Sequence, residues 1–431
     1  MIPYENPQTG TQADGRHARE QQQMQRPPRN TPIDWLSRFG LILAAFAISL
    51  ILGEVGLRLI GLSFPVFDTY DEVRGVKLVP GKRGWYRKEG AAYLEINSLG
   101  YRDREHDLAK PPGTFRIAVL GDSFTEARQM PVEDTYWHHL GEALATCPAL
   151  AGQKVEVLNF GIGGYGTAQE LLTYDLDARR FEPDLVLLGF FAGNDVRVNS
   201  KALSERTTNW LTARPFFRLT DDGLELSPPE PLPAWKRWIY DGVQHSRLLE
   251  LVNEARRQWS VRTKRRDQER RLQQIEMGIS AEVYQPADDP DLAEAWTLTE
   301  RILAKLAGRV QADGARFMVV TIPSSVQTHP DVAYRDALTV KLGVDDLLLP
   351  ERRLTAFGHE DGYPVFPLVA AMQAAAGDRH FHGFANTGYG QGHMNAAGHE
   401  AMAKLLAPKI CSELGKGAAS STAKDVVAFG N

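Results

Sequence analysis

Several residue classes that mark familiar protein types are scarce in this chain. Its 431 residues include only two cysteines, so neither a metal cluster nor a disulfide-rich scaffold is indicated. The formal net charge is -5 and no nucleic-acid motif is present, which argues against nucleic acid as the main partner. No internal repeat is visible, and no metal or organic cofactor is implied. What remains is an ordinary globular composition, 43% hydrophobic and 24% charged, long enough for one large domain with appendages.

The amino-terminal segment has almost no large apolar residues, whereas the segment after it is rich in them. Residues 1–34 cannot bury enough apolar surface to fold, so they are predicted to form a disordered tail. Within residues 35–62, the run Leu41–Leu52 is apolar apart from Ser49. A helix over this stretch is long enough to cross a bilayer of about 30 Å. Residues 35–62 are therefore predicted to be a transmembrane anchor.

Two alternatives to an anchor follow from the same stretch. A cleaved signal peptide is disfavoured, because the polar segment before the apolar run is long and no small-x-small cleavage site follows. A buried core helix is the other alternative. Basic residues precede the run and few follow it closely, so the tail is expected in the cytoplasm and the rest of the chain outside it. The preceding arginines are Arg19, Arg26, Arg29 and Arg38.

After a lead-in at 63–114, strands and helices alternate. In the lead-in, Trp85–Tyr86 and Tyr93–Ile96 are predicted to be short strands around Gly90. Later strands are predicted at Phe115–Leu120, Lys154–Phe160, Asp184–Phe191 and Arg316–Ile322, and helices at Thr135–Ala145, Thr167–Arg180 and Asn395–Leu414. This alternation predicts a parallel, doubly wound α/β sheet over residues 115–414. Residues 415–431 are small and polar and are predicted to be a disordered tail.

A long insertion, residues 197–290, separates the third and fourth of these strands. Its middle, Leu248–Met277, is helical by composition and strongly basic. The basic residues there are Arg256, Arg257, Arg262, Lys264, Arg265, Arg266, Arg270 and Arg271. Two interpretations are open: a solvated helix with acidic partners, or an arm or lid that contacts lipid headgroups or an anionic polymer.

Four polar loops follow predicted strands or precede the last helix, and they are expected at one edge of the sheet. They are Gly121-Asp-Ser123, Gly161–Gly166, Gly193-Asn-Asp195 and Gly392-His-Met-Asn395. In open α/β sheets the carboxyl edge is where ligands bind. A serine, a histidine and preplaced hydrogen-bond donors are the groups that acyl transfer needs.

Each candidate residue is assigned a role in that chemistry. Ser123 is the candidate nucleophile and His393 the candidate base. The oxyanion donors are expected to be the Ser123 N–H, the Gly164 N–H and the Asn194 side chain. Two supporting acids, Asp122 and Asp195, are expected to anchor the first turn and to brace the third loop.

These four blocks together resemble the SGNH (GDSL-type) hydrolases. The matching residues are Gly121-Asp-Ser123, Gly164, Gly193-Asn-Asp195 and His393-Met-Asn-Ala-Ala-Gly-His399, and the resemblance covers about residues 115–414. It implies a flavodoxin-like three-layer sandwich and ester hydrolysis or acyl transfer without a cofactor. The anchor and lead-in resemble a membrane-anchored bacterial subgroup.

The chain departs from the family at one position. The family usually has an aspartate three residues before the catalytic histidine, and Gly390 stands there. Three explanations stay open: Ser123 and His393 work as a dyad, a carboxylate comes from elsewhere, for which Asp378 is a weak candidate, or a backbone carbonyl holds the ring. Losing the acid costs a triad enzyme several orders of magnitude in rate.

The fold that the resemblance implies also bears on the two cysteines. In a flavodoxin-like fold the first and last helices share one face of the sheet. Cys147 follows the first helix and Cys411 lies near the end of the last. In an oxidising compartment the two thiols can form a disulfide, which a Cα separation well above about 7 Å would exclude.

The leading prediction is a single-pass protein of the bacterial inner membrane with a periplasmic or extracellular serine esterase domain. Its expected substrate is an acylated, for example O-acetylated, envelope glycan or lipid, handled beside envelope-polymer machinery. The same site also fits an O-acyltransferase whose acceptor is a sugar hydroxyl. The third hypothesis is a glycan-binding or assembly subunit without turnover. The missing acid at Gly390 favours it, and the presence of Ser123, Asn194 and His393 argues against it.

Overall fold

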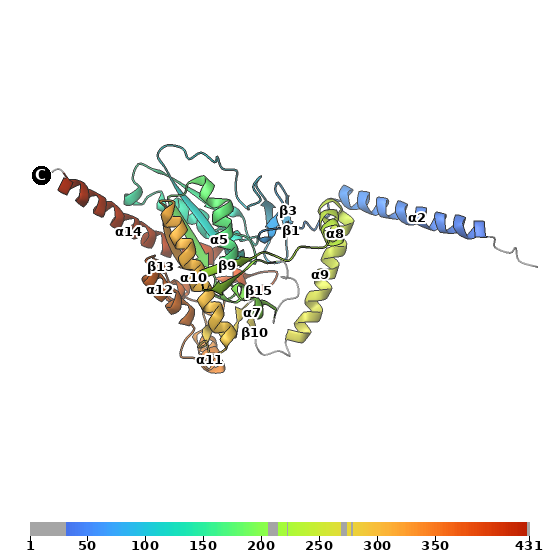
Figure 1. Ribbon diagram of the computed structural model, residues 1–431. Coiled ribbons are helices and arrows are strands. Elements are labelled where there is room, and N and C mark those ends of the chain that lie inside the picture. The colour runs from blue at the N-terminus through green and yellow to red at the C-terminus, as the bar shows by residue number, and fades with distance from the viewer. Residues whose placement is uncertain (1–31, 206–213, 222, 269–273, 277–278, 429–431) are drawn as a thin grey trace, which may run out of the picture. The chain divides into compact units, whose positions relative to one another are not determined.

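The computed structural model describes residues 32–205, 214–221, 223–268, 274–276 and 279–428 (Figure 1). The chain divides into two units, residues 1–61 and 62–431. The predicted tail lies outside the described residues up to position 31, as do Arg270 and Arg271 of the basic stretch.

The first unit contains helix α2, Pro32–Leu59. Its segment Trp35–Leu59 has a mean hydropathy of 2.2 and is long and apolar enough to cross a membrane. Signal sequences near an amino terminus share this length and composition. Glu54 and Arg58 form an ion pair of 2.7 Å one helical turn apart.

The second unit is built on a five-stranded parallel sheet. The strands are β5 (Thr114–Gly121), β6 (Lys154–Asn159), β7 (Leu185–Phe190), β12 (Arg316–Thr321) and β13 (Val365–Phe366). Their order across the sheet is β13-β12-β7-β5-β6, with every pairing parallel. Numbered along the chain this is the order 2-1-3-4-5 of a flavodoxin-like doubly wound sheet, with its switch point between β5 and β7.

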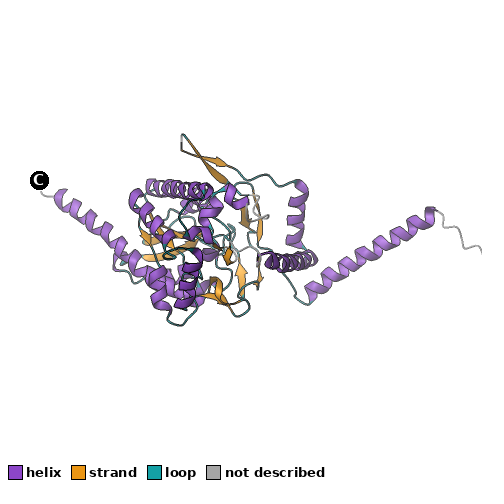
Figure 2. Ribbon diagram, turned by 90° about the horizontal axis from the view of Figure 1, so that it is seen from below, coloured by secondary structure: helices purple, strands orange, loops and turns teal. Residues whose placement is uncertain are grey.

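Helices cover both faces of this sheet, as Figure 2 shows. Alternate strand residues point to opposite faces. Ala118 and Leu120 belong to a core that includes α5 (Thr167–Leu176) and α10 (Pro290–Ala312), which lie side by side (Figure 1). Ile117 and Val119 belong to a second core with α4 (Tyr136–Leu144), α13 (Val369–Ala376) and α14 (Ala396–Ala428). The three-layer sandwich expected from the sequence is therefore present.

Shorter elements complete this unit. The remaining helices are α3 (Ser123–Glu126), α6 (Asp195–Asn199), α7 (Lys201–Glu205), α8 (Ala234–His245), α9 (Arg247–Gln268), α11 (Val332–Leu342) and α12 (Leu349–Asp361). The strand pairs are β1 (Asp68–Asp71) with β2 (Gly75–Leu78), β3 (Arg83–Tyr86) with β4 (Ala92–Glu95), β8 (Phe216–Thr220) with β9 (Gly223–Ser227), β10 (Gln274–Glu276) with β11 (Ile279–Ser280), and β14 (His382–Phe384) with β15 (Gly388–Met394). All five pairs are antiparallel.

The ends of two predicted helices differ from the structure. The helix expected to reach Arg180 ends at Leu176, and a short 3-10 helix, Ala178–Phe181, follows it. The last helix does not stop at Leu414 but continues to Ala428, into the segment predicted to be a tail. Between Gly415 and Ala428 that segment holds four alanines and two lysines, residues that favour helix.

A disulfide joins Cys147 to Cys411, with their Cα atoms 5.7 Å apart. Cys147 follows α4 and Cys411 lies on α14, and these two helices pack against each other on the same face of the sheet. Helix α4 begins near the carboxyl edge of the sheet and runs back, so the disulfide lies toward the opposite edge from Ser123.

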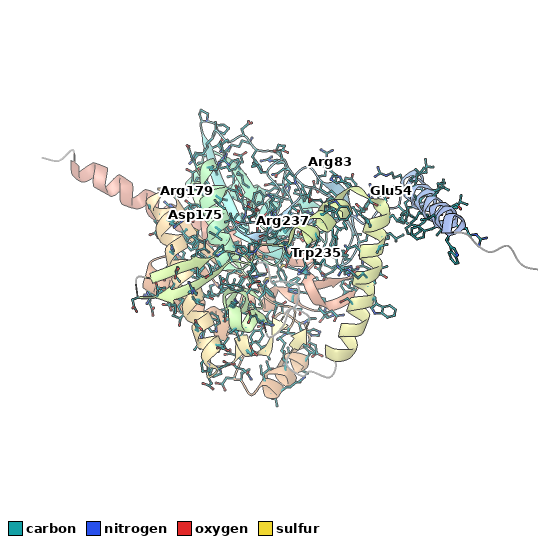
Figure 3. The ribbon with its side chains drawn as sticks, turned by 45° about the vertical axis from the view of Figure 1, so that its right-hand side comes forward. Glu54, Arg83, Asp175, Arg179, Trp235 and Arg237 are labelled. Carbon is teal, nitrogen blue, oxygen red and sulfur yellow. A yellow bond between two sulfur atoms is a disulfide. The ribbon has the colours of Figure 1, made fainter. Side chains whose placement is uncertain are left out.

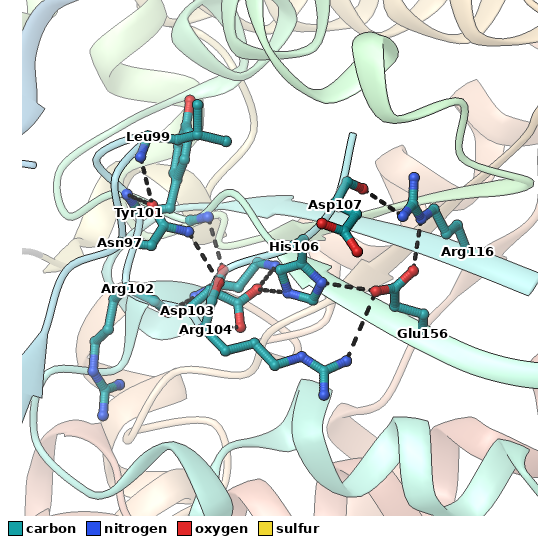
Figure 4. Close-up of polar contacts among 12 residues, drawn as sticks. Asn97, Leu99, Tyr101, Arg102, Asp103, Arg104, His106, Asp107, Arg116 and Glu156 are labelled. Atoms are coloured by element: carbon teal, nitrogen blue, oxygen red, sulfur yellow. Dashed lines mark hydrogen bonds and ion pairs between the residues drawn. The ribbon is translucent and has the colours of Figure 1, made fainter. Parts of the chain in front are cut away.

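A buried polar cluster attaches the lead-in to the sheet (Figure 4). The ring of His106 lies between two carboxylates, 3.1 Å from Asp103 Oδ2 and 2.9 Å from Glu156 Oε1. Glu156, on β6, also accepts a hydrogen bond of 2.6 Å from Arg116 of β5, whose guanidinium is fully buried. Burial alone would lower the pKa of His106, but the hydrogen bonds to Asp103 and Glu156 outweigh it and raise that pKa. The lead-in is therefore fixed to the sheet by charge as well as by its hairpins.

Candidate active site

The candidate nucleophile lies where β5 ends. Gly121 has φ +157°, and a Cβ there would lie 2.2 Å from Thr125 Oγ1, so the turn requires a glycine. Ser123 then starts the short helix α3, with Asp122 as its N-cap. One carboxylate oxygen of Asp122 accepts the N–H of Phe124 at 2.9 Å. The strand-to-helix turn thus presents Ser123 at the carboxyl edge of the sheet, beside the switch point.

Asp122 connects this turn to the third predicted loop. The Asn194 Nδ2 group donates to Asp122 Oδ2 at 2.8 Å, which fixes the orientation of the Asn194 amide. Burial raises the pKa of Asp122 to about 6, against the hydrogen bonds from Phe124 and Asn194 that lower it. Asp195 is fully buried and accepts the Phe191 N–H at 2.8 Å, so it ties down the start of the same loop.

The candidate base contacts the nucleophile directly. His393 lies near the end of β15, just before α14, and its Nε2 is 2.9 Å from Ser123 Oγ. The ring centroid of Phe124 lies 5.0 Å from that of His393, so an aromatic residue borders the imidazole. The two residues proposed to share a proton therefore lie within hydrogen-bond reach of each other.

The other ring nitrogen of His393 contacts a carboxylate from the lead-in. Nδ1 lies 2.5 Å from Glu89 Oε2, and the backbone N–H of His393 donates to Glu89 Oε1 at 2.8 Å. Burial would raise the pKa of Glu89, but the hydrogen bonds and charge of His393 lower it. An ionised carboxylate only accepts hydrogen bonds, so Nδ1 carries the proton and Nε2 is left to accept the Ser123 hydroxyl.

Glu89 reaches the histidine on the turn between β3 and β4. Gly90 has φ +64°, and a Cβ there would lie 2.2 Å from the Gln129 carbonyl oxygen. The Asn386 side chain accepts the Gly90 N–H at 2.9 Å and donates to the Gly90 carbonyl at 3.0 Å. At Gly392, a Cβ would lie 2.2 Å from Glu89 Oε1. Two glycines and one asparagine thus let the two hairpins approach closely.

Neither sequence position considered for the acid contacts the ring. Gly390 has φ +85°, and a Cβ there would meet His380 at 3.0 Å and His329 at 3.3 Å. Asp378 is exposed in the turn after α13. Sequence reasoning missed Glu89, because it lies 304 residues before His393. The one available signal was a carboxylate next to Gly90, the glycine between two predicted short strands.

The glycine loop after β6 lies beside the nucleophile. A Cβ on Gly163 would be 3.7 Å from Ser123 Cβ. The Gly163 N–H donates to Glu126 Oε2 at 2.5 Å, and the carbonyl of Gly164 accepts a bond of 2.6 Å from Arg214. Gly164 itself has φ +79°, which a glycine adopts without strain. The peptide proposed to supply an oxyanion donor is therefore held on both sides.

Salt bridges connect the lead-in to Glu126, the residue that holds the Gly163 N–H. Arg128 pairs with Glu126 and, at 2.5 Å, with Asp68 at the start of β1. Burial would lower the pKa of Arg128, but the charges of Asp68 and Glu126 raise it well above its usual range. The lead-in thus supports the oxyanion loop as well as the histidine.

No protein-family model and no curated protein matches this chain. Among solved structures it is similar to TesA, with 13% identity, a TM-score of 0.34, and coverage of 68% of this chain and 96% of that chain. It is also similar to the acetyl xylan esterase AlAXEase, with 12% identity, a TM-score of 0.35, and coverage of 68% and 98%. A catalytic mutant of an acetylxylan esterase from Geobacillus stearothermophilus gives 14% identity, a TM-score of 0.35, and coverage of 69% and 95%. At such low values these similarities carry no argument about activity, which has to come from the geometry of the site.

Proposed function

We propose that this protein is a membrane-anchored serine esterase that uses Ser123, His393 and Glu89 as a catalytic triad. The observation that carries the proposal is the continuous contact from Ser123 Oγ through the two ring nitrogens of His393 to Glu89. Binding alone has no need of a serine held against an imidazole whose tautomer is set by a carboxylate. The lack of an acid at position 390 favoured a subunit without turnover. In this proposal Glu89 supplies that acid from elsewhere in the chain, so this support for the binding subunit is lost.

In the proposed reaction the Ser123 oxygen attacks the ester carbonyl while His393 Nε2 takes its proton. The oxyanion is stabilised by the N–H groups of Ser123 and Gly164 and by the Asn194 side chain. His393 then gives its proton to the leaving alcohol as the ester bond breaks. Water, deprotonated by His393, attacks the acyl-enzyme, and the acid product leaves as Ser123 regains its proton. Throughout, Glu89 keeps the ring oriented and stabilises its charged form.

The proposed location is the outer face of a bacterial inner membrane, with α2 as a single anchor. The apolar length of α2 and the arginines before it support this placement. The disulfide between Cys147 and Cys411 fits an oxidising compartment such as the periplasm. The proposed substrate is an acyl ester, for example an O-acetyl ester, of an envelope glycan or lipid.

An O-acyltransferase uses the same residues with a sugar hydroxyl in place of water. The open orientation of the site toward solvent, with His393 about a third exposed, supports access for either acceptor. Adding a sugar acceptor to a reaction with an activated ester separates the two, because a transferase forms an acylated sugar faster than free acid.

The deciding experiment is covalent labelling of the full-length protein with a fluorophosphonate probe, which reacts with an activated serine. Wild type should label, and Ser123→Ala and His393→Ala should not. The matched control is Ser98→Ala, an exposed serine in the lead-in, which should label like wild type. Hydrolysis of a nitrophenyl acetate by the same proteins gives the catalytic readout. A folded wild-type protein that neither labels nor turns over would overturn the enzyme proposal in favour of a binding subunit.

A further inference from the structure

The helices α8 and α9 of the insertion carry an exposed apolar face that the catalytic proposal does not use. On α8, Trp235 and Trp238 are 62% and 77% exposed, and Ile239 is exposed beside them. Their spacing of three and four residues places the three side chains on one side of the helix. Figure 3 labels Trp235 and Arg237 on α8. Isolated exposed apolar residues are ordinary, but an outward stripe of two indoles and an isoleucine on one helix face needs an explanation.

The opposite side of α8 is occupied by contacts to the lead-in. Arg237 donates to Glu72 at 3.1 Å and lies over the ring of Tyr70 at 5.3 Å. Two turns further on, Gln244 donates to the Asp68 carbonyl at 3.1 Å. Because these polar side chains fix which face of α8 turns inward, the tryptophan face is held outward by the fold.

Helix α9 repeats the same two-sided arrangement. Its Glu250 side chain is nearly fully buried and accepts the Phe64 N–H at 3.1 Å, with Lys82 at 3.5 Å. Leu249 and Val252 lie on the other side and are exposed. We use the term outer face for the set Trp235, Trp238, Ile239, Leu249 and Val252.

The chain itself places the outer face near a bilayer. Helix α2 ends at Leu59, and Phe64, which binds α9, is five residues later. Even a fully extended chain spans only about 18 Å over five residues. The chain therefore keeps Phe64, and with it the Glu250 end of α9, within about 18 Å of the end of the proposed anchor.

The chemistry of the outer face fits the boundary between lipid tails and headgroups. Tryptophan is enriched at that boundary because its ring is apolar and its N–H is polar. Lys236 lies with its Nζ 5.5 Å from the Trp235 ring, and Arg256 is exposed on α9. Cations at these positions attract anionic headgroups. A helix with an aromatic face and flanking cations is typical of one that lies in the membrane interface.

We propose that the outer face of α8 and α9 lies in the headgroup region of the membrane that holds α2. This inference rests on the anchoring in the proposed function. It gives the catalytic unit a second membrane contact beside the anchor, on the helices that bind the lead-in. Since the lead-in carries Glu89, the contact would hold the active site at a constant height above the bilayer, where acylated lipids or lipid-linked glycans are within reach.

The test uses the full chain in nanodiscs of phosphatidylethanolamine and phosphatidylglycerol, with a nitroxide on a single introduced cysteine. The native cysteines are joined in the disulfide, so the introduced thiol is the one that reacts. Labels are placed by Trp238→Cys on the outer face, by Val340→Cys as an equally exposed control on α11, and by Ile48→Cys within α2. Collision with oxygen, which partitions into lipid, is compared with collision with a water-soluble nickel complex. Fluorophosphonate labelling of each variant checks that the catalytic unit is folded.

The expected result is an oxygen-to-nickel collision ratio at position 238 several-fold above that at 340 and below that at 48. Equal ratios at 238 and 340, with 48 in lipid, would overturn the second contact while leaving the anchor intact. A label at 238 that is protected from both reagents, in detergent as well as in nanodiscs, would indicate burial against another protein surface. If this protection increases with protein concentration, the contact is with a second copy, and the membrane contact is also overturned. An aqueous label at 48 would overturn the anchor and this inference together, while leaving the Ser123 chemistry to be judged by its own probe.

Discussion

The candidate site draws on two regions that differ in how they carry their residues. The sheet edge supplies Ser123, Gly164 and Asn194 on loops that follow consecutive strands, and His393 just before the last helix. The lead-in supplies Glu89 from a hairpin turn that is not part of the sheet. The first set can be recognised by the order and spacing of motifs. The second depends on a tertiary contact, so its acid can lie anywhere in the chain that the fold brings near.

The most direct way to break this comparison is to remove the carboxylate of the lead-in. Glu89→Gln keeps the size of the side chain but takes away the charge that sets the tautomer of His393. We expect kcat to fall about 10⁴-fold, the effect of the same change in a serine protease triad. The matched control is Asp378→Asn, the acid considered from sequence, which should leave kcat unchanged. Equal activity of wild type and Glu89→Gln would mean that Ser123 and His393 act as a dyad.

The sheet edge can be tested on its own through Asn194. Asn194→Ala removes one proposed oxyanion donor, and kcat should fall about 10²- to 10³-fold with KM little changed. A loop brace without a catalytic role would instead lower the melting temperature and raise KM together. Steady-state kinetics and a thermal melt on the same preparation distinguish the two outcomes.

The opposite edge of the sheet should matter for stability and not for turnover. Replacing both Cys147 and Cys411 by serine opens a loop closed over a sequence separation of 264. We expect a loss of about 2–5 kcal/mol in the free energy of unfolding. The value of kcat below the unfolding transition should stay unchanged. Denaturant unfolding with and without reductant measures the first quantity, and a drop in kcat of the folded double variant would show that the two edges are coupled.

The smallest expected effect concerns how the lead-in is held. The pKa of His106 is raised in the folded protein, so its stabilising charge is fully present below the unfolded value of about 6.5 and is lost as the pH rises through the folded pKa. His106→Gln should therefore lower the free energy of unfolding by about 1–3 kcal/mol at about pH 6 and by less at about pH 9. Denaturant unfolding at the two pH values checks this. A loss that grows with pH would contradict the proposed charge on His106.

Much of the sheet follows from local sequence. The bounds predicted for the strand from Phe115 and for the apolar run from Asp184 differ from those of β5 and β7 by one residue at each end. Strands covered on both faces are continuously apolar, which makes them recognisable. The two-residue strand β13 was not predicted, since Val365–Phe366 is too short to show a pattern. Helix α10 was also missed, although its start carries two recognisable signals, Asp289 as the N-cap and Pro290 in the first turn.

The site divides in the same way. Ser123 and His393 could be chosen from loop position and residue type, and their contact is what the flavodoxin-like order produces. Glu89 could not be chosen, because nothing in residues 63–114 indicates that the turn at Gly90 packs against the hairpin of His393. That approach depends on Gly392, where a side chain would collide with the carboxylate, and on the amide of Asn386. Contacts of this kind depend on the tertiary structure, and no periodic pattern in the sequence indicates them.

The position of Glu89 has a consequence for proteolysis. A cut in the largely exposed stretch Asp107–Gly113 would leave Ser123, Asn194 and His393 on one fragment and the carboxylate on the other. The larger fragment would keep every recognisable motif and lose its acid once the pieces separated. In the proposed enzyme, shedding of the domain at this point would therefore also silence it, so activity would be confined to molecules that still carry their membrane-proximal segment.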